Sequence, residues 1–224
     1  MLKMNIDFSF IHQEKFITLD NVDELNNKFE YINNKRIYSS PYEHITQLTR
    51  KETYLEPAFE RLSKKIELFF RDNLGLDDLK LAKLWLVTSL SKNANSTILP
   101  YIPHFDKHRY LKAMVYLHDV TKRHGPIHLG RTHDHVSIEQ RRNTLPDDYK
   151  ELGLNTVSRE DLQDEMIPMT GSAGDIIFFD TNTPHKAGIV SKGFERRVLR
   201  FDFDLDGLNI KPSFLKRVMN RFFK

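Results

Sequence analysis

The sequence contains no cysteine among its 224 residues, and this absence limits its chemistry. Disulfide bonds, thiolate zinc sites and cysteine nucleophiles are excluded, so a metal ion would have to be held by His, Asp or Glu. There is no run of about 18 apolar residues, the length that a transmembrane helix needs. Residues 1–15 lack the apolar stretch and small-residue cleavage site of a secretory signal. We therefore expect a cytoplasmic protein.

The sequence also has little net charge. Its 34 basic and 31 acidic residues leave a formal charge of +3. Residues 211–224 carry five basic side chains and no acidic one, so the rest of the chain has a formal charge of −2. Nucleic-acid binding requires a basic surface on the body of the domain, so we expect no nucleic-acid partner.

The basic carboxy-terminal segment has an amphipathic pattern. Over residues 212–223, apolar side chains fall on one half of a helical wheel and basic or amide side chains on the other. Such a helix can bind peripherally to a membrane or to an acidic partner. It can equally dock on its own domain or mediate a dimer, and the sequence leaves these alternatives open.

The length is typical of one domain, and no repeat or low-complexity linker divides the chain, so we expect residues 1–224 to form a single domain. Residues 1–80 are predicted to be mainly helical. One helix is expected to be capped by Asp20, and a second is expected over 55–73, lined on one side by Leu55 among others and ended by Gly75. The apolar positions of the first helix keep helical spacing: Val22, Leu25, Phe29 and Ile32.

From about residue 81 to 206 the pattern changes to short apolar or alternating runs separated by turn residues. Strands at such spacing indicate an all-β sandwich or barrel. A polar insertion at 131–165 interrupts the series, and short helices are expected near Pro146–Asp148 and after Ser158. An insertion of this length is either a lid or binding loop, or a solvated excursion.

A metal site is the chemistry that the sequence favours. His104 and Asp106 are two residues apart, so on a strand they point to the same face and can bind one ion. His185, which follows the apolar run 175–180 and a proline-containing turn, is the best third ligand. Two histidines and one carboxylate form the facial triad of non-haem Fe(II) oxygenases, which leaves coordination positions open. Tyr110 and Lys112 share the parity of His104 and are candidates to line the same cavity.

A nearby arginine adds to this prediction. Arg196 lies eleven residues after His185, at the start of the next apolar run. A buried arginine can hold a carboxylate with two parallel hydrogen bonds, and an enzyme that uses 2-oxoglutarate needs such a group beside its iron. Arg197 is the rival, because it shares a face with the apolar residues of that run. The residues alone leave the choice between the two arginines open.

These motifs resemble the phytanoyl-CoA dioxygenase family of Fe(II)/2-oxoglutarate oxygenases. The resemblance covers residues 103–133, 171–180 and 185–203, about half of the chain. The family pattern reads H-x-D, L-x-D-V, an N-G-P turn, a P-G-S-H phrase, G-D, the distal His and an Arg eleven residues on. The departures are His in place of Asn in the turn, and Gly-Arg-Thr-His in place of P-G-S-H. The matching positions are His104/Asp106, Leu117-His118-Asp119-Val120, His124-Gly125-Pro126, Gly130-Arg131-Thr132-His133, Gly174-Asp175, His185 and Arg196.

The resemblance implies a mainly β (α+β) domain, a double-stranded β-helix of the jelly-roll type with N-terminal helices packed outside. It implies that His104, Asp106 and His185 hold Fe(II), and that Arg196 binds 2-oxoglutarate. The expected activity consumes O2 and 2-oxoglutarate, releases succinate and CO2, and hydroxylates an unactivated C–H of a small-molecule, lipid or glycan substrate. Two alternatives stay open: a non-catalytic binding barrel, and a cupin-like metalloenzyme that does not use 2-oxoglutarate.

Overall fold

A computed structural model describes residues 9–34, 38–39, 43–76, 79–91, 99–106, 109–131, 149–153, 156–159 and 166–204. Its helical elements are α1 (Leu19–Asn33), α2 (Arg50–Tyr54), α3 (Pro57–Leu74) and the 3-10 turn η1 (Lys122–His124). Its strands are β1 (Phe10–Gln13), β2 (Tyr38–Ser39), β3 (Glu43–Thr49), β4 (Lys80–Leu90), β5 (Phe105–Asp106), β6 (Tyr110–Tyr116), β7 (His128–Gly130), β8 (Tyr149–Gly153), β9 (Thr156–Arg159), β10 (Met166–Pro168), β11 (Ile176–Asp180), β12 (His185–Lys186) and β13 (Glu195–Asp204).

The two long helices lie where the apolar spacing predicts them. The four apolar residues that define the predicted face of α1 are all buried. The N-cap of α1 is Thr18, and Asp20 lies in the first turn instead of capping the helix as predicted. Gly75 ends α3 in the left-handed region, with φ of 65°. Leu55 is not on the apolar side of α3, because it follows α2 and is 71% exposed.

The first 80 residues also contain strands that the helical interpretation missed. Strand β3 pairs with β4 over seven residues, and β1 pairs with β11, more than 160 residues away in the chain. These strands are short, and their partners are distant in sequence, so local periodicity does not reveal them. They extend the main sheet at both of its edges.

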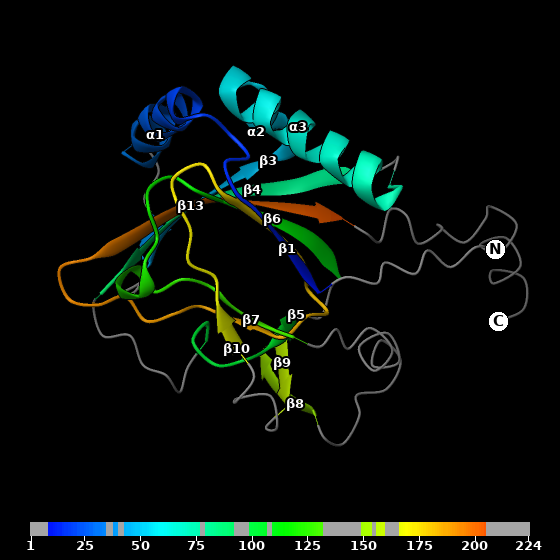
Figure 1. The fold of residues 1–224 in the computed structure, drawn as a ribbon, viewed down its shortest axis with the longest axis vertical. Coiled ribbons are helices and arrows are strands. Elements are labelled where there is room, and N and C mark those ends of the chain that lie inside the picture. The colour runs from blue at the N-terminus through cyan, green and yellow to red at the C-terminus, as the bar shows by residue number, and fades with distance from the viewer. Residues whose placement is uncertain are drawn as a thin grey trace, which may run out of the picture.

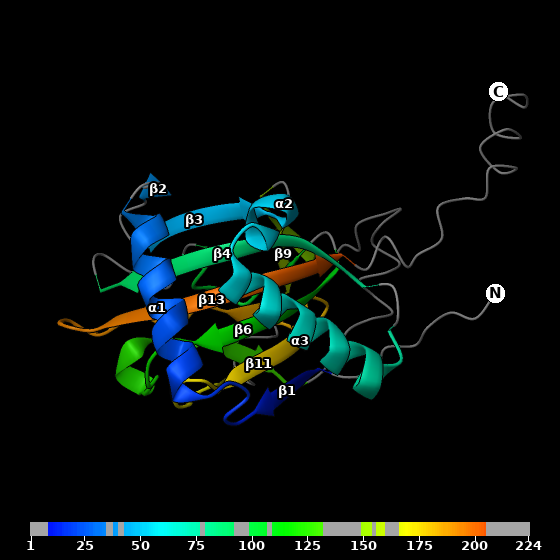
Figure 2. The same ribbon diagram turned by 90° about the horizontal axis from the view of Figure 1, so that it is seen from above.

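The main sheet has seven antiparallel strands in the order β1-β11-β6-β13-β4-β3-β2. Strand β13 is central, and it pairs with β4 on one side and β6 on the other. All three helices lie on one face of this sheet, where α1 and α3 cross its strands (Figures 1 and 2). None of the helices among the described residues is long and apolar enough to span a membrane.

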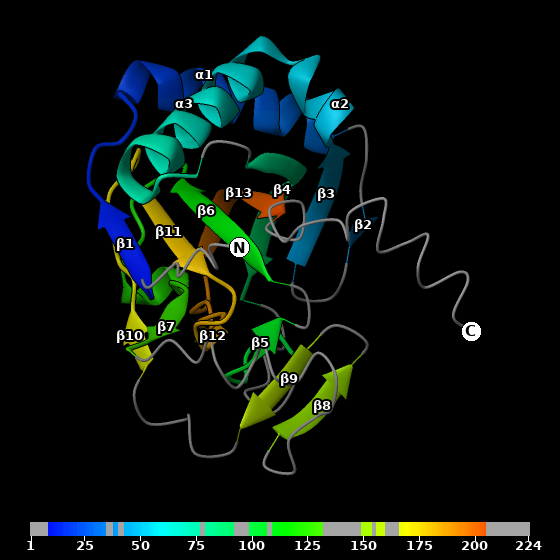
Figure 3. The same cartoon turned by 90° about the vertical axis from the view of Figure 1, so that its right-hand side faces the viewer.

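Two three-stranded sheets lie on the other side of the main sheet (Figure 3). Their strand orders are β10-β7-β12 and β5-β9-β8. Together with the main sheet they form the predicted jelly-roll, or double-stranded β-helix. Residues 149–153 and 156–159 form the hairpin β8–β9, so the helix expected from Pro146–Asp148 onward is wrong, and Ser158 lies within a strand. Residues 132–148, 154–155 and 160–165 of the insertion, and the basic segment 211–224, lie outside the described residues.

Each face of the main sheet packs against its own core. Along β6, Leu111, Ala113 and Val115 belong to the core beneath the helices. The alternate residue Met114 belongs to the smaller core between the sheets, and Lys112 shares its side of the strand. The inner side is therefore only partly apolar, and its polar side chains surround a pocket.

Candidate metal and co-substrate site

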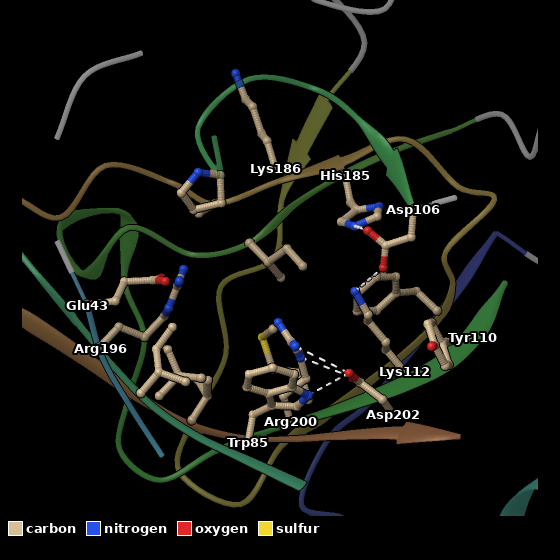
Figure 4. A pocket seen from close by; sticks show the side chains of 18 of the residues that line it. Glu43, Trp85, Asp106, Tyr110, Lys112, His185, Lys186, Arg196, Arg200 and Asp202 are labelled. Atoms are coloured by element: carbon tan, nitrogen blue, oxygen red, sulfur yellow. Dashed lines mark hydrogen bonds and ion pairs between the residues drawn. The ribbon is translucent and has the colours of Figure 1, made fainter. Parts of the chain in front are cut away.

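A pocket of about 330 Å³ lies between the main sheet and the two smaller sheets. Its walls include inward-facing side chains of β3, β4, β6, β11 and β13 (Figure 4). All four predicted site residues line it: His104, Asp106, His185 and Arg196. The volume is at the lower end of the range for small-molecule sites.

The structure brings the three predicted metal ligands together. His104 and His185 form an isolated antiparallel bridge, in which each backbone N–H donates to the other residue's carbonyl at 3.0 Å. Asp106 follows on β5, on the same side as His104. One ligand atom from each of the three residues lies within 4.8 Å of the other two. Within the described ranges this is the one group of three or more such residues close enough to share an ion.

The hydrogen bonds of both histidines leave a nitrogen for a metal. Nδ1 of His104 donates to the carbonyl of Ile102 at 2.8 Å, and Nδ1 of His185 donates to that of Thr183 at 2.9 Å. Because a carbonyl only accepts, each Nδ1 carries the proton and each Nε2 keeps its lone pair. Nε2 of His185 is buried and has no hydrogen-bond partner. A metal ion at this position would satisfy it.

The electrostatics keep His104 and Asp106 in the forms that bind metal. Burial, with a contribution from His185, lowers the pKa of His104 to about 3, so its imidazole is neutral near pH 7. Burial alone would raise the pKa of Asp106, but the ammonium of Lys112 and the two histidines hold it well below its usual value. The site thus contains an ionised carboxylate and a neutral imidazole, the donors that Fe(II) takes in a facial triad.

Arg196 faces the pocket, and its rival does not. The Arg196 side chain is buried, and its guanidinium donates to the carbonyl of Gly125 and, at 3.0 Å, to Oγ of Ser89. Its Nε is buried without a hydrogen-bond partner. Arg197 lies on the opposite face of β13 and forms ion pairs with Glu30 and Glu195 at 3.0 and 3.2 Å.

Gly125 is the turn residue that presents its carbonyl to Arg196. Its φ is +62°, and a Cβ added there would lie 2.5 Å from the carbonyl oxygen of Gly188. Only glycine fits such a close approach in the left-handed region. The His-Gly-Pro phrase of the sequence therefore supports the arginine rather than the metal.

A buried ion pair supports the loop that carries His185. Arg109 donates from Nε and Nη2 to Oδ2 of Asp180, at 2.8 and 2.5 Å, and the Asp180 side chain is fully buried. The other oxygen of Asp180 accepts the backbone N–H of Asn182. This arrangement fixes the turn between β11 and β12. Neither member of the pair was identified from the sequence, where Arg109 lies among unremarkable polar residues.

Other motif residues are structural. Asp119 accepts the N–H of Ala173 at 2.9 Å, and Asp175 accepts N–H groups of Lys15 and Ser172, both at 2.8 Å. They join the end of β6 to the turn before β11. His118, His124 and His128 belong to no metal-binding group among the described residues. His108, His133 and His135 lie outside the described residues.

The wall of the pocket contains polar residues that the sequence analysis missed. Trp85 donates from its indole N–H to Asp202 at 2.6 Å, and Arg200 bonds both oxygens of the same carboxylate, at 3.0 and 3.2 Å. The guanidinium lies 4.7 Å from the centroid of the Trp85 ring. In Figure 4 this group lies away from the metal ligands, across the pocket from His185. Strand parity from Arg196 would have placed Arg200 and Asp202 in the pocket.

Comparison with known proteins agrees with this geometry. The sequence profile of the family described as Phytanoyl-CoA dioxygenase (PhyH) matches residues 10–198. No curated protein sequence matches the chain.

Several solved structures share the fold. The epimerase SnoN, in complex with Fe3+, alpha ketoglutarate and nogalamycin RO, is 18% identical, with a TM-score of 0.65 over 92% of this chain and 86% of SnoN. The carbocyclase SnoK from nogalamycin biosynthesis is 15% identical, with a TM-score of 0.62 over 91% and 83%. HygX from Streptomyces hygroscopicus, with nickel, 2-oxoglutarate and hygromycin B bound, is 11% identical, with a TM-score of 0.59 over 92% and 84%. These similarities support the double-stranded β-helix.

Proposed function

Because the chain belongs to the phytanoyl-CoA dioxygenase family and is an Fe(II)- and 2-oxoglutarate-dependent oxygenase, we propose that it hydroxylates a C–H bond of a small molecule. His104, Asp106 and His185 would hold the iron. Arg196 would bind the carboxylate of 2-oxoglutarate that lies away from the metal. The bound iron and co-substrate supply the oxidation chemistry, in which 2-oxoglutarate and O2 become succinate and CO2.

The observation that carries this proposal is that one pocket holds both a possible metal-binding group and a buried arginine. Ligand atoms of His104, Asp106 and His185 lie within 4.8 Å of one another, and Arg196 lines the same pocket. The three ligand atoms fit a metal ion, and the guanidinium fits a carboxylate. The remaining contribution of the chain is to orient these groups and to exclude water from the pocket.

The Arg196→Gln variant tests the co-substrate assignment. We expect it to weaken 2-oxoglutarate binding by about 10–100-fold, because a charge-assisted hydrogen bond contributes about 1.5–3 kcal/mol. Fe(II) affinity should stay close to that of the wild type, because Arg196 is not a metal ligand. Anaerobic titration of the metal-free protein with Fe(II), and then of the iron-loaded protein with 2-oxoglutarate, measures the two affinities. Arg197→Gln is the matched control, because its side chain faces the helices.

Unchanged 2-oxoglutarate binding in Arg196→Gln, with iron still bound, would favour the cupin-like alternative, which needs no arginine at this place. The non-catalytic alternative makes a different prediction. It expects metal or ligand binding without any conversion of 2-oxoglutarate to succinate.

The charges of the pocket indicate the substrate class. Among the residues that the structure describes, its lining contains five basic and three acidic side chains, a formal charge of +2 with neutral histidines. Divalent iron and dianionic 2-oxoglutarate cancel each other, so the substrate would still meet this excess. Arg200 is held rigidly by Asp202 and Trp85, and Lys83 and Lys186 complete the basic lining. We propose a small substrate with a carboxylate or phosphate group rather than a neutral lipid chain or glycan.

Matched pairs of small acids and their neutral amides test this substrate class. We expect acids to stimulate succinate formation by the wild type, and their amides to be at least about tenfold poorer, because each loses a charge-assisted contact. Arg200→Gln should raise KM for the stimulating acid and leave the KM for 2-oxoglutarate unchanged. Amides that stimulate as well as acids would contradict an anionic substrate.

A further inference from the structure

Lys112 is a buried lysine on the inner face of the main sheet. It lies in the middle of β6, between Phe179 of β11 and Asp202 of β13 in the strand register. Its side chain is 7% exposed. Lysine is rarely buried to this extent unless it is paired. The resident chemistry of the pocket, a metal triad and a carboxylate-binding arginine, does not by itself require a lysine here.

The partner of Lys112 is a metal ligand. Its Nζ lies 2.5 Å from Oδ2 of Asp106, and Figure 4 shows the ammonium directed at this carboxylate. The other oxygen, Oδ1, lies on the side of His185, 3.5 Å from its Nε2. The two oxygens of Asp106 therefore have different surroundings. One is bonded to the ammonium, and the other faces the nitrogen that would bind the metal.

Lys112 makes this contact although a second carboxylate is its direct neighbour. Asp202 lies opposite Lys112 in the β6–β13 register. The oxygens of Asp202 accept from Trp85 and Arg200, and the Lys112 ammonium forms no ion pair with it in the part of the chain that the structure describes. Trp85 and Arg200 thus already bond the carboxylate of Asp202, and the Lys112 ammonium pairs with Asp106 instead.

We propose that Lys112 is a positioning residue that restricts Asp106 to binding the metal through one oxygen, Oδ1. This inference rests on the proposed metal triad and goes beyond it. The ammonium lies 2.5 Å from Oδ2 and therefore constrains the orientation of the carboxylate. A second carboxylate oxygen on the iron would occupy a coordination position that the co-substrate or oxygen needs.

The test uses Co(II) as the metal probe, because the visible spectrum of the ion reports its coordination. We expect Lys112→Met to change the Co(II) spectrum in the absence of 2-oxoglutarate. We also expect the affinity of the cobalt-loaded protein for 2-oxoglutarate to fall by about tenfold, the lower end of the effect of removing an outer-shell partner. Lys112→Arg, which keeps the positive charge, should recover most of both properties. Lys112→Gln replaces the methionine variant if the latter does not fold.

Lys83→Met is the matched control, because Lys83 lines the same pocket but is exposed and contacts Trp85 instead of a metal ligand. Its Co(II) spectrum should equal that of the wild type. A Co(II) spectrum of Lys112→Met that superimposes on that of the wild type would overturn the proposal. This holds even if the variant lowers the Tm of the metal-free protein or weakens 2-oxoglutarate binding. Absence of Co(II) binding by the wild type would instead overturn the metal triad, and this inference with it.

Discussion

Replacement of His185 by alanine is expected to weaken Fe(II) binding by more than about 100-fold and to abolish conversion of 2-oxoglutarate to succinate. Loss of an outer-shell partner of a metal ligand already costs about 10–100-fold, and the ligand itself contributes more. His185 also lies at the centre of the site. Its backbone forms a β-bridge with His104, and its imidazole faces Asp106. Metal content after dialysis against Fe(II), and succinate formation, measure the two effects.

His128→Ala is the matched control for this experiment. His128 lies on β7, opposite Lys186 of the strand that carries His185, and its Nδ1 also donates to a carbonyl two residues earlier in the chain. It does not belong to the metal-binding group or line the pocket. Its replacement should leave Fe(II) affinity within about threefold, well below the effect of losing an outer-shell partner. Equal losses in the two variants would mean that His185 acts through the fold and not as a ligand.

Replacement of Arg109 by methionine is expected to lower the free energy of unfolding by about 3–5 kcal/mol. Removal of one partner of a buried ion pair leaves the other charge uncompensated in a medium of low polarity. Asp180 has no exposed surface and loses two hydrogen bonds from the guanidinium to its Oδ2. The loop that presents His185 depends on the same carboxylate through Asn182. Denaturant titration of the metal-free protein measures the loss.

Two further variants identify the cause of this loss. Arg61→Met breaks an exposed ion pair in which Nη2 of Arg61 lies 2.6 Å from Oε2 of Glu24. It should lower the free energy of unfolding by less than about 1 kcal/mol. Adding Asp180→Asn to Arg109→Met removes the buried carboxylate charge and should restore part of the stability. A loss below about 1 kcal/mol in Arg109→Met would contradict the importance of the buried pair.

The grouping of His104, Asp106 and His185 was predictable because its evidence is local. The spacing of His104 and Asp106 needs only strand parity, and His185 follows a clearly apolar strand. The choice between Arg196 and Arg197 needed the register of β13, which shows which of two adjacent side chains faces the pocket. Strand alternation predicts that Arg196 and Arg197 point to opposite faces of the sheet, but it does not show which of these faces lines the pocket.

The features that the sequence did not predict depend on distant pairing. Strand β3 is recognisable only once β4 lies beside it, and the helical signals after residue 146 are overridden by the hairpin β8–β9 and its pairing with β5. Parity correctly made Lys112 a candidate to line the pocket. It could not decide between Asp106 and Asp202 as the partner, because that depends on which acid Arg200 already holds.

The central claim is that this pocket binds iron and 2-oxoglutarate together. The most direct test is an anaerobic titration of the metal-free protein with Fe(II) and then 2-oxoglutarate, followed by the visible metal-to-ligand charge-transfer band. The account predicts a band that saturates at one iron and one 2-oxoglutarate per chain and is absent from His185→Ala. A wild-type protein that binds iron but develops no band, or that binds no iron, would contradict it.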